Sequence, residues 1–182
     1  MFLRSVEEFD ARVQTVTRDH MDKPTPCSDW NVHDLLNHVV NEDRWVKPLL
    51  EGKTIEEVGN SLDGDLLGDD AQLAWKHASE EAKTAAQESG ATERIVHLSF
   101  GDFSGGDYLD QVTADHLIHG WDLAMGAGCN VNLDNELMEH VFAWATPIED
   151  VLKGSGSYGE KIEPPDDADL QTRLLAVFGR RA

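Results

Sequence analysis

The chain has 182 residues, 40% of them apolar and 27% charged, which is ordinary for a globular protein that can bury one core. Acidic residues dominate, because 35 Asp and Glu stand against 15 Lys and Arg, giving a formal net charge of −20. Such a surface repels phosphate backbones and anionic lipids, so nucleic acid and membranes are excluded as expected partners. The chain has neither a spanning apolar run nor a secretory start, which predicts a cytoplasmic protein.

The first helix is expected over residues 6–20, where apolar residues recur at helical spacing. Glu8 stands three residues after Ser5, a spacing typical of a capping box at the start of a helix. Pro24 and Pro26 then disfavour both helix and strand and predict a break.

A second helix is expected to begin near Asn31, which can cap it, and to end between Pro48 and Gly52. Trp30 is expected to pack at its start. His38 falls on the apolar face and should point inward, and Glu42, four residues later, could orient its imidazole. That apolar face consists of Leu35, Leu36, Val39, Val40 and Val46.

The middle of the chain alternates loops and helices. Residues 52–70 are rich in glycine and acids and predict a loop with a short turn over residues 54–58. An alanine-rich third helix is expected over residues 70–89. Residues 94–100 favour one short extended segment, and a fourth helix is expected over residues 108–127.

The remaining residues predict a fifth helix, which Pro147 should kink or divide, and a short last helix over residues 168–178. The fold expected from these elements is mainly all-α, a four-helix bundle with long connections and one short extended segment. We expect a single domain over residues 1–182, in which residues 155–182 form a short C-terminal extension.

The fourth helix carries the strongest chemical pattern. Asp115 and His119 are four residues apart, so they lie on one face and could bind one metal ion, with His38 as the best third ligand. The alternative is that the pair only forms a hydrogen bond on a buried face. His116 competes as a ligand, but it is rotated by about 100° from Asp115. Asp122 could orient a ligand or cap a neighbouring turn.

Cys27 and Cys129 lack the spacing of a metal or redox motif and are too few for a disulfide scaffold. Reduced, inert thiols are expected, and reactive thiols are the alternative.

Two segments resemble a known group. Residues 25–40, TPCSDWNVHDLLNHVV, are similar to a signature of actinobacterial proteins in the DinB/YfiT-like superfamily, and residues 119–124, HGWDLA, match a second signature of that group. Residues 158–180 resemble its closing segment. The group is related to the metal-binding N-terminal domain of mycothiol-dependent maleylpyruvate isomerase. The resemblance implies the DinB/YfiT-like four-helix bundle.

The resemblance also implies a metal site. His38 and His119 match histidine ligands of a divalent ion, with zinc preferred and nickel and iron as alternatives. Asp115 stands at the third ligand position, where the isomerase has the longer glutamate. The implied activity is that of a thiol S-transferase or isomerase, with no catalytic side chain beyond the ligands. The ion would activate mycothiol or a similar thiol to attack a small electrophile, in a monomer or homodimer.

Two other functions are compatible with these residues. One is a non-catalytic metal- or small-molecule-binding module of a stress response, built on the same bundle. The other is a non-haem iron oxygenase, since two histidines and one carboxylate also form the iron triad. The oxygenase ranks last, because that triad usually sits on a β-barrel.

Overall fold

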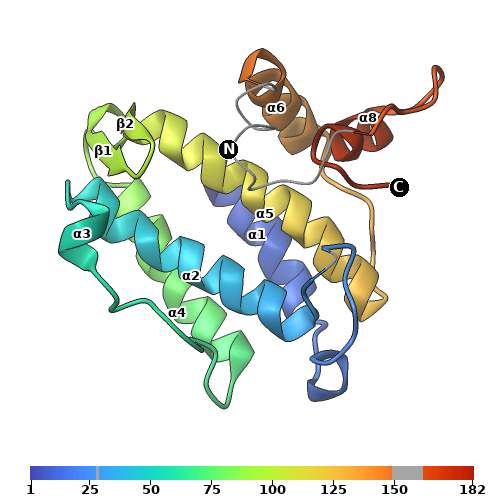
Figure 1. Ribbon diagram of the computed structural model, residues 1–182, viewed down its shortest axis with the longest axis horizontal. Helices are drawn as coiled ribbons and strands as arrows, with labels where there is room; N and C mark the ends of the chain where they lie inside the picture. The colour runs from blue at the N-terminus through green and yellow to red at the C-terminus, as the bar shows by residue number, and fades with distance from the viewer. Residues whose placement is uncertain (28, 149–161) are drawn as a thin grey trace.

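Four helices pack around a common core in the computed structural model, which describes residues 1–27, 29–148 and 162–182 (Figure 1). They are α1 (Phe2–Val13), α2 (Val32–Leu50), α4 (Ala71–Ala86) and α5 (Gly105–Ala127). Helix α2 contacts α4 and α5, and α1 contacts the same two helices from the other side, which closes a four-membered ring. Apolar side chains at helical spacing fill the centre, among them Phe9, Leu35, Val39, Trp75 and Val112. The mainly helical bundle is therefore confirmed.

The start of the chain differs from the expectation over residues 6–20. Helix α1 begins at Phe2 and ends at Val13, and a separate 3-10 helix follows at Arg18–His20. Ser5 lies inside the first helix, where its hydroxyl donates to the carbonyl oxygen of Phe2 at 2.8 Å. The predicted capping box is wrong, because a residue caps a helix only if it precedes the first turn.

The cap of α2 is confirmed. The Asn31 side chain accepts a hydrogen bond from the backbone N–H of Asp34 at 2.9 Å, and Asp34 reaches back to the backbone of Asn31. The start of α2, and with it the position of His38 along the helix, is thus defined by local side-chain chemistry. The short turn after α2 is also present, as helix α3 (Ile55–Val58).

The extended segment is one half of a hairpin. Strand β1 (Ile95–Leu98) pairs in antiparallel fashion with β2 (Gly101–Ser104), so that Ile95 lies opposite Ser104. The second strand was not predicted, since its sequence has little β propensity. Helix α5 starts directly after it, three residues before the expected residue 108, and Ser104 caps its first turn.

Helix α5 is shared by two cores. Helices α6 (Asn135–Ala145) and α8 (Leu170–Val177) lie on the side of α5 that faces away from α2 and α4 (Figure 1). Their apolar residues meet Leu117, Ile118 and Trp121 of α5 in a second cluster. Because α5 carries several aspartates, it is not a spanning segment, and none of the described helices has the length and apolar character to cross a bilayer.

The last elements follow the predicted order. Helix α6 ends at Ala145, and a 3-10 helix at Thr146–Ile148 that contains Pro147 follows it. The part of the predicted fifth helix beyond residue 148 lies outside the described residues. The expected start of the extension at residue 155 lies outside the described residues.

Gly126 allows the loop that precedes α2 to lie against α5. A Cβ atom at Gly126 would lie 2.8 Å from Val32 Cγ2 and 3.2 Å from the carbonyl oxygen of Pro24, whereas one at Gly120 would make only ordinary contacts of 3.5 Å or more. We expect Gly126→Ala to lower the free energy of unfolding by about 1–3 kcal/mol, the usual cost of overpacking. Gly120→Ala should leave it unchanged or raise it by up to ~1 kcal/mol through helix propensity. Urea denaturation of both variants tests this, and equal stabilities would contradict it.

Candidate metal site

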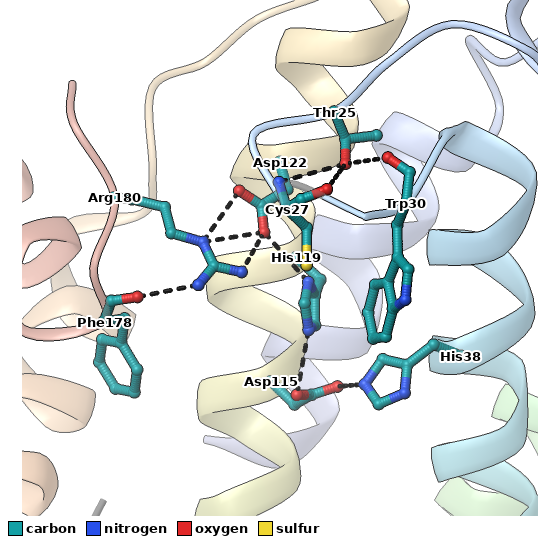
Figure 2. A network of polar contacts seen from close by, with 9 residues as sticks. All are labelled: Thr25, Cys27, Trp30, His38, Asp115, His119, Asp122, Phe178 and Arg180. Atoms are coloured by element: carbon teal, nitrogen blue, oxygen red, sulfur yellow. Dashed lines mark hydrogen bonds and ion pairs between the residues drawn. The ribbon is translucent and has the colours of Figure 1, made fainter. Parts of the chain in front are cut away.

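Three side chains from two helices meet inside the bundle. His38 comes from α2, and Asp115 and His119 lie one turn apart on α5. His38 Nε2 lies 3.2 Å from Asp115 Oδ2, and His119 Nε2 lies 3.4 Å from Asp115 Oδ1 (Figure 2). One ligand atom of each residue lies within 4.8 Å of the other two. The structure therefore brings together all three predicted ligands.

These separations fit a shared ion. Ligand atoms about 2.05 Å from a tetrahedral ion lie about 3.3 Å apart. The two contacts of Asp115 are near this value but end on its two different oxygens, and the three ligand atoms lie within 4.8 Å of one another. Asp115 Oδ2 is buried and has no hydrogen-bond partner of acceptable geometry, despite its nearness to His38. A buried carboxylate oxygen without a partner is costly. Two imidazoles beside this carboxylate form a donor set of the kind that binds a divalent cation.

The site opens on one side. The exposed fraction of the His38 side chain is 26%, against 13% for Asp115 and 6% for His119. The His38 edge is therefore the part of the cluster most open to solvent, while the other two side chains are more covered.

Trp30 covers another side of the site. Its ring centroid lies 4.7 Å from that of His38 and 5.5 Å from that of His119. The Thr25 hydroxyl donates to the carbonyl oxygen of Trp30 at 2.8 Å and holds this loop (Figure 2). This contact with the imidazoles goes beyond the predicted packing at the start of α2. Its only sequence signal was its place one residue before the Asn31 cap.

The local charges favour a cation. Burial opposes protonation of His38, but the nearby carboxylates of Asp115 and Glu42 outweigh it and raise the pKa of His38. Burial likewise opposes ionisation of Asp115, yet the imidazoles of His119 and His38 hold its pKa well below the usual range. Each shift reflects the stabilisation of a positive charge beside a buried carboxylate.

Glu42 adds a further carboxyl group one turn after His38. The structure shows no hydrogen bond between the two side chains, so the expected orienting contact is not made. Burial, followed by repulsion from Asp115, raises the pKa of Glu42 to about 7, although His38 acts in the opposite direction. Glu42 is thus neutral over part of the acidic range and charged above neutrality.

His116 is not part of the site. It points into the core, where Nδ1 lies 3.0 Å from the Ser5 hydroxyl and Nε2 lies 3.1 Å from Asp43 Oδ1. Its ring also stacks on Phe2, with centroids 5.7 Å apart. The competing assignment of His116 as third ligand is therefore not supported by its position, and its rotation on the helix explains why.

Asp122 holds the far side of the His119 ring. Asp122 Oδ2 lies 3.1 Å from His119 Nδ1, and Arg180 Nη2 donates to the same oxygen at 2.8 Å. Of the two roles expected for Asp122, its contact fits the first, since it holds the ring of His119. A carboxylate only accepts hydrogen bonds, so Nδ1 of His119 donates to Asp122, and Nε2 on the other edge of the ring faces Asp115. Arg180 was not identified as a site residue from the sequence.

Cys27 lies next to this network (Figure 2). Burial raises the pKa of its thiol, against the opposing effect of Arg180. The thiol is therefore protonated near neutral pH, which agrees with the expected inert cysteine.

The pKa of Glu42 predicts a pH-dependent stability of the metal-free protein. Its ordinary pKa is 4.5 and its folded pKa is about 7, so the folded state binds more protons between these values and loses stability as pH rises through them. Glu42→Gln should therefore be more stable than the wild type at pH 8, by about 1–3 kcal/mol, with the difference shrinking toward pH 5. Chemical denaturation at both pH values tests this. The exposed Glu80→Gln is the control, and a wild-type-like pH profile for Glu42→Gln would contradict the assignment.

The family model of the mycothiol maleylpyruvate isomerase N-terminal domain matches residues 2–124, a span that includes all three clustered side chains. Two uncharacterized proteins of Mycobacterium tuberculosis, from strains CDC 1551 and H37Rv, are each 29% identical to this chain, over 97% of its length and 94% of theirs. No solved structure matches the chain significantly. The matched domain is of the DinB/YfiT-like superfamily. The chain therefore belongs to the family of the mycothiol maleylpyruvate isomerase N-terminal domain.

Proposed function

We propose that the chain is a metal-dependent enzyme that uses mycothiol or a similar low-molecular-weight thiol, as an S-transferase or isomerase. The observation that carries the proposal is the clustering of His38, Asp115 and His119, which each offer one ligand atom within 4.8 Å of the other two. Membership of a family named for a mycothiol-dependent isomerase supports the choice of thiol.

Zinc is the preferred ion, because two histidines and one carboxylate form a common catalytic zinc set that leaves a position open. Nickel and iron accept the same ligands. The helical bundle gives no support to the oxygenase alternative, whose triad usually sits on a β-barrel.

A divalent ion held here would lower the pKa of a thiol that binds it, so that the thiol is a thiolate near neutral pH. The residues of the chain supply the surroundings for this step. Trp30 shields the imidazoles on one side, and the exposed edge of His38 marks the side on which a thiol and an electrophile can enter. Asp122 keeps the proton of His119 on Nδ1, away from the ligand position.

Among the described residues, no side chain is a better nucleophile for this site than an external thiol. Ser5 lies beside His116 and Asp43, but its exposed fraction is 1%, so substrate cannot reach it. Cys27 is the nearest thiol, and burial raises its pKa. An external thiol as the nucleophile therefore agrees with what surrounds the site.

We expect protein purified without a histidine tag to contain about one divalent ion per chain. His38→Ala removes a direct ligand, so it should weaken zinc binding by more than roughly 10–100-fold. That range is the usual effect of removing a residue that hydrogen-bonds to a ligand. His33→Ala is the matched control, since His33 lies on the same helix and meets only Asp34 and Asp65. Elemental analysis and competition with a chromophoric chelator measure both variants. Equal affinities, or no ion in the wild type, would refute the site.

A thiol-conjugation screen separates the enzyme from a binding module. The wild type should consume thiol and electrophile together, chelator should abolish the reaction, and added zinc should restore it. Metal binding without turnover, together with a rise in melting temperature on adding thiol, would favour the non-catalytic module instead.

A further inference from the structure

The part of the chain beyond the family match returns to the site through Arg180. The match ends at residue 124, whereas Arg180 follows α8 near the end of the chain. Gly179, with a φ of 75°, turns the chain, and the backbone N–H of Arg180 donates to the carbonyl oxygen of Leu175 at 2.8 Å. The Arg180 side chain is thereby directed inward and is 7% exposed (Figure 2).

Arg180 holds the Asp122 carboxylate by two nitrogens. Its Nε lies 3.2 Å from both oxygens of Asp122, and its Nη2 lies 2.8 Å from Oδ2. Its Nη1 donates to the carbonyl oxygen of Phe178 at 2.8 Å, which fixes the guanidinium itself. A planar donor fork of this kind defines the plane of the carboxylate that it binds, which a lysine cannot do.

The plane of that carboxylate in turn determines how His119 is presented. Asp122 is completely buried, and the oxygen that receives Arg180 Nη2 also accepts from His119 Nδ1 at 3.1 Å. The imidazole cannot turn over without losing this hydrogen bond. Its Nε2 therefore stays directed at the point it shares with His38 and Asp115.

We propose that Arg180 is a positioning residue of the metal site, which acts through Asp122 on the orientation of His119. The inference rests on the proposed metal site. Through Arg180, the segment after residue 124 contributes to that site, although Arg180 contacts none of the three proposed ligands.

Arg12 offers a matched control. Its side chain is also 7% exposed, and it too joins the bundle to the chain beyond the family match, through a 2.8 Å hydrogen bond to the carbonyl oxygen of Asn132. It makes no contact with Asp122. Loss of either arginine should cost stability, but only the loss of Arg180 should alter the metal site.

The test measures zinc affinity by competition with a chromophoric chelator. Arg180→Met should bind zinc about 10–100-fold more weakly than the wild type, the usual effect of removing an outer partner of a ligand. The zinc affinity of Arg180→Lys should lie between those of the wild type and Arg180→Met, and this variant replaces Arg180→Met if that one fails to fold. Arg12→Met should bind zinc as the wild type does. Asp122→Asn should lower zinc affinity to a similar extent. Adding Arg180→Met to Asp122→Asn should lower it no further, because Arg180 acts on His119 only through Asp122.

A second readout needs no metal. In the metal-free wild type, nitrogen-15 NMR of the imidazoles should show the Nδ1–H of His119 hydrogen-bonded to a carboxylate, and Arg180→Met should alter this signal while Arg12→Met does not. If the wild type binds zinc and Arg180→Met binds it equally well, the proposed role of Arg180 is refuted but the metal site is not. A wild type that binds no zinc would instead overturn the proposed function and, with it, this inference.

Discussion

The Asp115 carboxylate lies between imidazoles from two different helices, and the site depends on this contact. A buried carboxylate is unfavourable unless positive charge lies beside it. Here the partners come from the same helix, one turn away, and from α2 across the bundle. The caps and apolar faces that bring α2 and α5 together thus determine whether the three side chains meet.

The position of the site on α5 explains why two parts of the chain contribute to it. Asp115, His119 and Asp122 follow the i, i+4, i+7 spacing of one helical face. On one side of this stripe, Val112 and Leu123 face the bundle core, and on the other side apolar residues face the second core. Side chains on the stripe can therefore meet α2 from one direction and the end of α8 from the other.

Much of the site could be predicted from the chain alone, because its information is local. The four-residue spacing of Asp115 and His119 defines a shared face, and the Asn31 cap places His38 on its helix. That the two helices are neighbours does not follow from periodicity, since periodicity says which face is buried and not against what. The resemblance to a known family supplied that pairing.

The residues that were missed make contacts far apart in the sequence. Arg180 reaches Asp122 across 58 positions, and no spacing rule covers such a distance. The Ser5 cap was wrong for a related reason: packing of Phe2 in the core extends the first helix past the residue whose local chemistry suggested a start. Local patterns therefore predicted which side chains would cluster, but not what surrounds them.

The most direct measurement of the central claim is a crystal structure of the zinc-soaked protein with anomalous data collected at the zinc edge. The expected result is one strong peak about 2.0–2.2 Å from His38 Nε2, His119 Nε2 and a carboxylate oxygen of Asp115. No peak at this point, with the three side chains in contact only with one another or with zinc bound elsewhere, would contradict it.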